Sequence, residues 1–247
     1  MSIVALLITL RAVEAKAALA MMKSDFVSAV THELKTPVAV IRLVGDTLSS
    51  GRYTPDAVGE YARVLSHEAQ RLGQSIDQLL TYARYSEAQR NEAPQFSTLN
   101  LRELLDTTLE NLRFALTAAH ATLTLDVPDG LPPIAVDRLA ISHVFENIVD
   151  NAIKYSAGEP KIQVSAQISG RFISMTVADE GIGIPREDIK HVFDRFYRGH
   201  NVNTGGSGLG LTIVRRILEY HGAEIRLRSS VNVGTEVELL LPIASAL

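Results

Sequence analysis

The chain of 247 residues contains no cysteine, so disulfide bonds, thiolate zinc sites and cysteine nucleophiles are all excluded. It has no strong excess of one charge: the formal net charge is −4 at pH 7, which gives no reason to expect nucleic acid as a partner. It also lacks internal repeats and low-complexity tracts. What remains is the composition of an ordinary globular protein, long enough for one large domain or two small ones.

A hydrophobic run long enough to cross a bilayer is missing as well. The apolar stretch from Ile3 to Leu10 is far shorter than the roughly 20 residues of a transmembrane helix. No lysine or arginine precedes it, as a signal peptide would require. Two interpretations stay open: a buried first turn of a helix, or the tail of a transmembrane helix that begins upstream of residue 1. Arg11 and Lys16 follow the stretch, as on the cytoplasmic side of a membrane.

Apolar residues that alternate in steps of four and three predict one long helix from Val13 to Leu48. Its seam consists of Phe26, Val30, Pro37, Val40 and Val44, with Glu33 in one slot. His32 falls between seam positions and therefore faces outwards. Pro37 should bend the helix just after this histidine, and Gly51 and Pro55 then break the chain.

The same rhythm predicts a second helix from about Pro55 to Ala88. Its seam consists of Tyr61, Leu65, Leu72, Ile76, Leu79 and Ala83. Two such helices make an antiparallel hairpin, and a lone hairpin leaves its apolar stripe exposed. We expect two copies of the chain to cover this stripe by forming a four-helix bundle. The alternative is that the stripe packs on the rest of its own chain.

A polar break from Asn91 to Pro94 predicts a short linker, after which the pattern changes. Strands are predicted at 95–99, 121–127, 161–169, 172–178, 223–229 and 235–242. Helices are predicted at 100–118, 137–156 and 210–221, the second with Asp137 as its N-cap. This segregation predicts an α+β sandwich with helices on one face of a mixed sheet.

The helix predicted at 137–156 carries Asn147, Asn151 and Lys154 at spacings of four and three, which place them on one face. Two amide oxygens can help to hold Mg²⁺, which takes few protein ligands. A lysine beside them can neutralise phosphate. Alone, such an asparagine pair is more often a solvated helix face, so its meaning depends on the motifs that follow.

Two glycine-containing motifs lie downstream. Asp179 to Gly183 follows an apolar strand; its glycines allow close backbone approach, and its carboxylate can accept hydrogen bonds from the exocyclic amine of adenine. An ordinary strand-ending turn is the alternative. The stretch from Gly205 to Gly210 opens the last helix, where free N–H groups and the helix dipole favour phosphate. It is neither a Rossmann nor a P-loop motif, because no strand precedes it and no Gly-Lys-Ser/Thr follows. Residues 198–207, rich in Gly, Asn and Thr, predict a mobile lid.

In this order, the motifs resemble those of the sensor histidine kinases of two-component signalling, and the similarity spans about Ser24 to Pro242. The matching boxes are the phosphoacceptor box His32–Pro37, the N box Asn147–Tyr155, the first glycine box Asp179–Gly183, the F box Phe193–Arg198, the second glycine box Gly206–Gly210 and the final turn Gly234-Thr235. Each box alone is weak, whereas all of them in sequence order are specific.

The resemblance implies an α+β multidomain protein. Residues 1–22 would be an N-terminal helix that can be the tail of a transmembrane segment. Residues 23–90 would be the dimerisation and histidine phosphotransfer domain, built from the hairpin. Residues 95–247 would be a catalytic ATP-binding domain, an α/β sandwich of the Bergerat type shared with gyrase and Hsp90. The whole would be the cytoplasmic portion of an inner-membrane sensor.

The resemblance also implies ATP and Mg²⁺ as cofactors. Asn151 would bind Mg²⁺ with Asn147 close by, while Lys154 and Tyr155 would contact phosphate or ribose. Asp179 would hydrogen-bond adenine. The other cofactor-binding residues would be Gly181, Gly183, Gly206, Gly208, Leu209 and Gly210, and Arg198 would reach the γ-phosphate.

The implied reaction is transfer of the γ-phosphoryl group to His32, then to an aspartate of a response regulator. An unperturbed imidazole is mostly neutral at pH 7, so one ring nitrogen is free to attack, and Glu33 can accept the proton on the other. Thr36 either orients a water in the reverse, phosphatase reaction or merely precedes the proline bend. Two other classes stay in view: an ATPase that acts as a conformational clamp, and a scaffold without catalysis.

Overall fold

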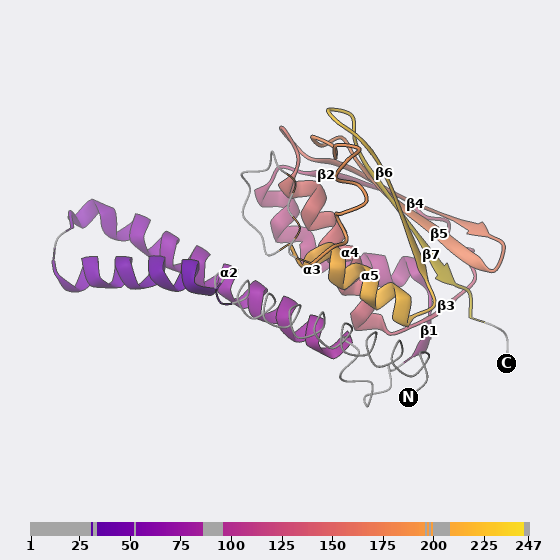
Figure 1. The fold of residues 1–247 in the computed structure, drawn as a ribbon, viewed down its shortest axis with the longest axis horizontal. Coiled ribbons are helices and arrows are strands. Elements are labelled where there is room, and N and C mark those ends of the chain that lie inside the picture. The colour runs from indigo at the N-terminus through magenta and orange to yellow at the C-terminus, as the bar shows by residue number, and fades with distance from the viewer. Residues whose placement is uncertain are drawn as a thin grey trace, which may run out of the picture. The chain divides into compact units, whose positions relative to one another are not determined.

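The computed structural model describes most of the chain, namely residues 31, 34–51, 53–85, 96–195, 197, 199 and 208–244. The chain divides into two compact units, Met1–Asp77 and Gln78–Leu247 (Figure 1). Within the described residues, no helix is both long enough and apolar enough to span a membrane. The stretch from Ile3 to Leu10 lies outside them.

The helical hairpin makes up the described part of the first unit, and its second helix continues beyond Asp77 into residues of the second unit. Residues 34–49 form its first helix, and η1 (Pro55–Ala57) leads into α2 (Val58–Tyr85), which returns along it (Figure 1). The first helix continues through Pro37, and the bend predicted there stays a prediction. The predicted long helix is confirmed from residue 34 to residue 48. Its earlier part, which includes His32 and Glu33, lies outside the described residues.

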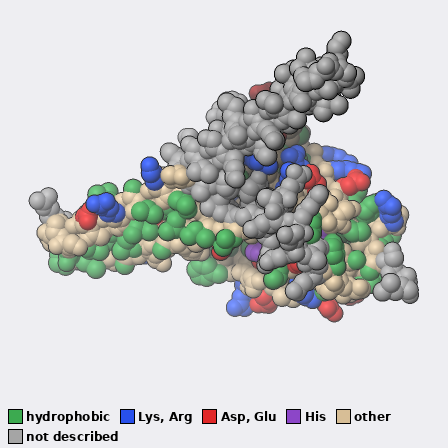
Figure 2. Space-filling model, turned by 60° about the horizontal axis from the view of Figure 1, so that its bottom comes forward, with side chains coloured by type: hydrophobic (Ala, Val, Ile, Leu, Met, Phe, Trp, Pro, Cys, Tyr) green, Lys and Arg blue, Asp and Glu red, His purple; other side chains and the backbone are tan. Residues whose placement is uncertain are grey.

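The hairpin buries only part of its predicted seam. Pro37 and Val44 are buried, and the half-buried seam residues are Val40, Tyr61, Leu65 and Leu72. Ile76 is 42% exposed, and Leu43, outside the predicted seam, is 67% exposed. Figure 2 shows hydrophobic side chains lying open along the hairpin. A single chain therefore leaves apolar surface that a second helical pair could cover.

A five-stranded sheet forms the centre of the second unit, with its strands in the order β2-β4-β5-β7-β6. β2 runs parallel to β4, and all the other neighbours are antiparallel. The final strand of the sequence, β7, thus lies inside the sheet rather than at an edge. The bounds are β2 (Thr122–Asp126), β4 (Lys161–Ser169), β5 (Phe172–Asp179), β6 (Glu224–Ser230) and β7 (Gly234–Pro242).

One face of this sheet is covered by three helices, α3 (Leu101–Ala118), α4 (Arg138–Lys154) and α5 (Gly210–Tyr220) (Figure 1). Two of these helices begin at a residue whose side chain caps the helix N-terminus. The Asn100 side chain accepts hydrogen bonds from the backbone N–H groups of Arg102 and Glu103, the second and third residues of α3. The Asp137 side chain accepts one from Ala140 N at 3.1 Å, which confirms it as the N-cap of α4.

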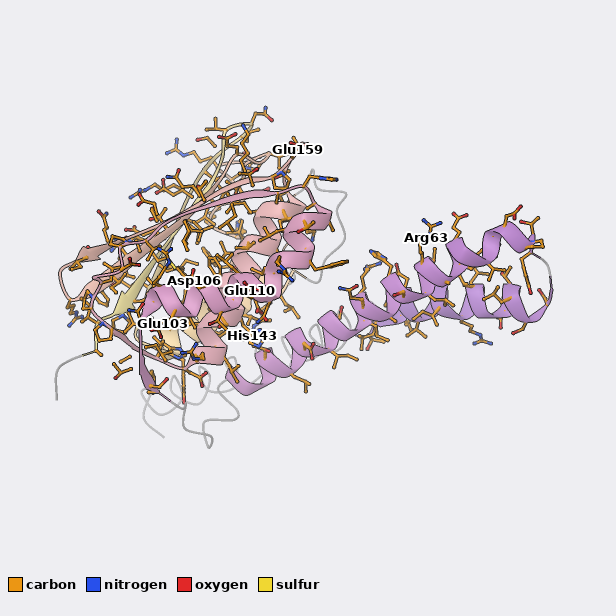
Figure 3. All side chains as sticks on the ribbon, turned by 180° about the vertical axis from the view of Figure 1, so that it is seen from behind. Arg63, Glu103, Asp106, Glu110, His143 and Glu159 are labelled. Atoms are coloured by element: carbon orange, nitrogen blue, oxygen red, sulfur yellow. The ribbon has the colours of Figure 1, made fainter. Side chains whose placement is uncertain are left out.

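Strand alternation places the core between the sheet and the helices. The buried residues of the three central strands on this face are Ile162, Val164, Ala166, Ile173, Met175, Val177, Val237, Leu239 and Leu241. α3 buries one side, and its exposed side carries Glu103, Asp106 and Glu110 (Figure 3). The predicted α+β sandwich with helices on one face is confirmed.

A second, two-stranded sheet joins β1 (Ser97–Leu99) to β3 (Ile134–Val136) in antiparallel fashion. Ile134 also forms a bridge with Ile243 near the end of the chain. The sequence predicted a strand at 95–99 but none at β3. β3 leads directly into Asp137, so this small sheet fixes the place where α4 begins.

Candidate functional site

Asp179, the last residue of β5, ties the loop that follows it to the start of β7 through one carboxylate oxygen. Its Oδ1 accepts hydrogen bonds from Gly181 N at 2.8 Å and from Thr235 N at 3.2 Å. Burial raises the pKa of the Asp179 carboxyl group, and these two N–H donors act in the opposite direction. No hydrogen bond from the described residues occupies Oδ2. One oxygen thus orients the side chain, and the other is left for a ligand that offers an N–H donor.

The glycines beside Asp179 allow the loop to pack closely against its surroundings. A Cβ on Gly181 would lie 2.7 Å from the carbonyl oxygen of Tyr155, at the end of α4. Gly183 has φ +67°, and a Cβ there would overlap the backbone carbonyl of Ser230. The sequence suggested that these glycines serve the approach of a ligand. In the structure, each makes close contact with the protein's own backbone.

α4 presents the residues of the N box along its length. Asn147 Nδ2 donates to the carbonyl oxygen of His143 at 2.8 Å, which leaves its Oδ1 available. Asn151 is half-buried and makes no side-chain hydrogen bond among the described residues. Lys154 Nζ lies 5.0 Å from the centroid of the Tyr155 ring, a cation–π distance that keeps the cation near the end of the helix.

The start of α5 meets α4 at Asn147. A Cβ on Gly210 would lie 2.9 Å from Asn147 Oδ1, so a larger residue there would force the Asn147 side chain to move. Gly208 has φ +66°, and Leu209 is buried next to it. The contact brings the first free N–H groups of α5 beside the amide oxygen of Asn147. Two motifs far apart in the sequence therefore converge at one place.

The described part of the F box is anchored to α5. Thr212 Oγ1 donates to the carbonyl oxygen of Phe193 at 3.1 Å, and the Arg215 guanidinium lies 5.7 Å from the Phe193 ring centroid. Tyr197 OH donates to Asp188 Oδ1 at 2.6 Å, which raises the pKa of Tyr197 to about 12. Arg198, Gly206 and the predicted lid lie outside the described residues, apart from Gly199.

The turn between β6 and β7 supports the site, a role that no sequence motif beyond Gly234-Thr235 indicated. Ser229 Oγ accepts from Ile184 N at 2.8 Å and donates to the carbonyl oxygen of Gly234 at 2.8 Å. Asn232 N donates to the carbonyl oxygen of Ile182 at 2.8 Å. These bonds lock the loop after Asp179 onto the last hairpin of the sheet.

Comparison with known proteins agrees with this arrangement. Residues 22–88 match the family model for the His Kinase A (phospho-acceptor) domain. Residues 136–245 match the model for the histidine kinase-, DNA gyrase B- and HSP90-like ATPase. The two ranges together take in more than half of the chain. The chain belongs to the sensor histidine kinases.

Individual members of this histidine kinase family show how far the likeness extends. The sensor-like histidine kinase SenX3 of Mycolicibacterium smegmatis is 31% identical over 223 residues, which are 89% of this chain and 57% of SenX3. The chain thus spans little more than half of that relative. The Acinetobacter baumannii histidine kinase AdeS has a TM-score of 0.70 at 22% identity, covering 87% of this chain and 98% of AdeS. The histidine kinase ThkA, solved in complex with the response regulator TrrA, has a TM-score of 0.72 at 20% identity, covering 93% and 64%. These two structures share the fold.

The site also fits the metal that the histidine kinase family implies. Among the described residues, no three His, Cys, Asp or Glu side chains gather as a metal-binding group. The two donors that the family resemblance implies are the amide oxygens of Asn147 and Asn151, and α4 carries the carboxylates of Glu146 and Asp150 as further hard oxygen donors. A cation such as Mg²⁺ suits so small a set, because it keeps several waters and takes phosphate oxygens from a nucleotide.

Proposed function

We propose that the chain is an ATP-dependent protein-histidine kinase that phosphorylates its own His32 and passes the phosphoryl group to an aspartate of a response regulator. The observation that carries the proposal is that α4 meets the start of α5 at Asn147 and the loop after Asp179 at Tyr155, in a domain that follows a phosphoacceptor helix. We assign phosphotransfer and dimerisation to residues 23–90 and ATP binding to residues 95–247. The family matches at 22–88 and 136–245 support this division.

In this proposal, each part of the site meets one part of ATP. Asp179 Oδ2 accepts from the exocyclic amine of adenine. Lys154 and the first N–H groups of α5 neutralise phosphate oxygens. Asn147 and Asn151 would hold Mg²⁺, which supplies charge neutralisation at the phosphates when bound. Arg198 would reach the γ-phosphate.

The chemical step would be in-line displacement at the γ-phosphorus. A lone pair of the neutral His32 imidazole forms the new P–N bond, the bond to the bridging oxygen of ADP breaks, and ADP leaves with that electron pair. Glu33 accepts the proton from the other ring nitrogen, which stabilises the charge that develops on the ring. The protein's main contribution is positioning and charge neutralisation.

The hairpin and the related proteins support two binding partners. The apolar side chains left open along the hairpin support a homodimer in which two copies form a four-helix bundle. The complex of ThkA with a response regulator supports a receiver domain as second partner. A cytoplasmic location belongs to the same proposal, because that is where ATP is supplied.

Incubation of the chain with γ-labelled ATP and Mg²⁺ tests the proposal. We expect an acid-labile, base-stable label on the protein, and we expect His32→Gln to lose it while still binding ATP. Label that persists in His32→Gln would place the phosphoryl group elsewhere. ATP hydrolysis without any label would favour the conformational clamp, and absence of ATP binding would favour the scaffold.

Thr36 tests the phosphatase part of the proposal. Thr36 is exposed on the first helix, one turn beyond His32 in sequence, where its hydroxyl can orient a water. We expect Thr36→Ala to slow dephosphorylation of the regulator by about 10-fold or more and to spare autophosphorylation. Thr47→Ala is the matched control, since Thr47 Oγ1 bonds only to the Leu43 carbonyl oxygen of its own helix at 2.8 Å. Equal loss of both activities in Thr36→Ala would argue against a specific role.

A further inference from the structure

His221 lies directly after α5 and is buried, with 4% of its surface exposed. Both ring nitrogens have backbone partners. Nδ1 lies 2.7 Å from the carbonyl oxygen of Ile217, in the last turn of α5. Nε2 lies 3.1 Å from the N–H of Asp137, the N-cap of α4. Because a carbonyl oxygen only accepts and an N–H only donates, Nδ1 must carry the proton and Nε2 must not. The surroundings therefore select one neutral tautomer.

This imidazole joins the two helices that build the nucleotide site. α4 and α5 pack on each other, and they meet at Gly210 and Asn147 at one end and at His221 and Asp137 at the other. The two contacts are about ten residues apart on each helix, or roughly 15 Å. Two contacts at this separation set the distance between the helices and prevent one helix from sliding along the other.

The surroundings of His221 disfavour its charged form. Burial is the main cause that lowers the pKa of His221, while the bond to the Ile217 carbonyl and the charge of Asp137 act in the opposite direction. The Phe96 ring packs edge-on at 5.1 Å, and the Tyr220 ring lies 6.0 Å away. Asp137 and Tyr220 are thus the titratable groups that face the imidazole, and Phe96 shields it with an apolar surface.

We propose that His221 is a positioning residue for ATP: as a neutral imidazole it holds α4 and α5 in register, and its protonation releases that register and weakens ATP binding. A proton added at Nε2 turns the acceptor into a donor that faces the N–H of Asp137, so the tie is lost. This inference rests on the proposed function, because it takes α4 and α5 to be the helices that hold ATP.

The test measures the Kd of the full chain for ATP with Mg²⁺ between pH 8 and pH 5.5, in parallel with His221→Gln. The glutamine amide can donate and accept as the imidazole does, but it does not titrate in this range. Comparison at each pH also cancels the titration of ATP itself. We expect the ratio of the wild-type Kd to the His221→Gln Kd to rise about fivefold as pH falls, the effect of one lost hydrogen bond.

The direction and onset of the change follow from the chemistry. Since the pKa of folded His221 is lowered, the rise should begin below the ordinary histidine range of about 6.5. Phe96→Ala exposes the ring and should move the onset to higher pH. His120→Asn is the matched control, because His120 is exposed with φ 52°, a conformation that asparagine accepts. The Kd of His120→Asn for ATP should show the same pH dependence as that of the wild type.

Each outcome has a defined meaning. His221→Leu should bind ATP more weakly at pH 8 even at temperatures where it is fully folded, whereas a purely structural role predicts loss of stability alone. Parallel profiles for wild type and His221→Gln, or unchanged affinity in folded His221→Leu, would overturn the inference and leave the proposed function standing. Failure of the wild type to bind ATP at any pH would overturn both.

Discussion

Replacing Asp179 by asparagine is expected to abolish useful ATP binding while leaving the fold intact. The Oδ1 atom of asparagine can still accept from Gly181 N and Thr235 N, so the loops stay in place. The Oδ2 acceptor, however, becomes an NH₂ donor that opposes the amine of adenine. The variant loses a charge-assisted hydrogen bond and buries two N–H donors that face each other. Together these effects should weaken the free energy of ATP binding by about 3 kcal/mol, which raises the Kd roughly 100-fold.

Calorimetric titration with ATP and a thermal melt of the same sample measure the two halves of this prediction. Glu180→Gln is the matched control, because Glu180 is the next residue and, within the described part of the chain, forms an ion pair with Lys161 alone, at the surface and at 3.1 Å. It should bind ATP within about twofold of the wild type. An Asp179→Asn protein that binds ATP normally would show that this carboxylate does not read the base.

The second large effect is expected from Gly183→Ala compared with Gly170→Ala. Both glycines have positive φ, +67° and +61°, so both alanines carry the left-handed penalty of about 1 kcal/mol. They differ in space: nothing lies within 4 Å of a Cβ on Gly170, whereas one on Gly183 would overlap the Ser230 carbonyl. Moving the backbone apart should add about 1–3 kcal/mol at Gly183 alone.

Urea unfolding of the two variants separates the energetic cost of the close contact at Gly183 from the cost of the left-handed backbone conformation that both glycines share. We expect Gly170→Ala to bind ATP normally and Gly183→Ala to lose affinity as well as stability, because the displaced loop follows Asp179 directly and its Gly181 N orients that carboxylate. If both variants lost the same free energy of unfolding, the close contact at Gly183 would have no energetic weight.

Much of the fold could be predicted because its signals are local. The alternation from 161 to 169 predicted β4 with the bounds that the structure shows, and Asp137 marked the start of α4 through capping chemistry. β3 was missed because three residues after two prolines carry no periodic pattern. β3 is stabilised by its pairing with β1 and with Ile243, which lie far away from it in the sequence. Likewise, no periodicity shows that β7 lies between β5 and β6.

The candidate site, like the fold, could be predicted from the sequence only in part. Residue types at short spacing pointed to Asn147, Asn151 and Asp179. What each one touches depends on the three-dimensional fold: Thr235 reaches Asp179 because β5 and β7 are paired there, and His221 reaches Asp137 because α5 returns beside α4. The sequence assigned the glycines to ligand approach. The structure shows that Gly181 and Gly183 pack against the protein's own backbone, and their role in cofactor binding stays a prediction.

The place of β7 has a consequence for synthesis on the ribosome. The strand that supplies Thr235 to the carboxylate is the last to be translated, yet it must insert between two strands made earlier. A nascent chain that ends before β7 therefore carries the Asp179 carboxylate without Thr235 N, one of the two donors that orient it. In the proposed function, such a partial domain would hold adenine poorly, so ATP binding would begin only after β7 has joined the sheet.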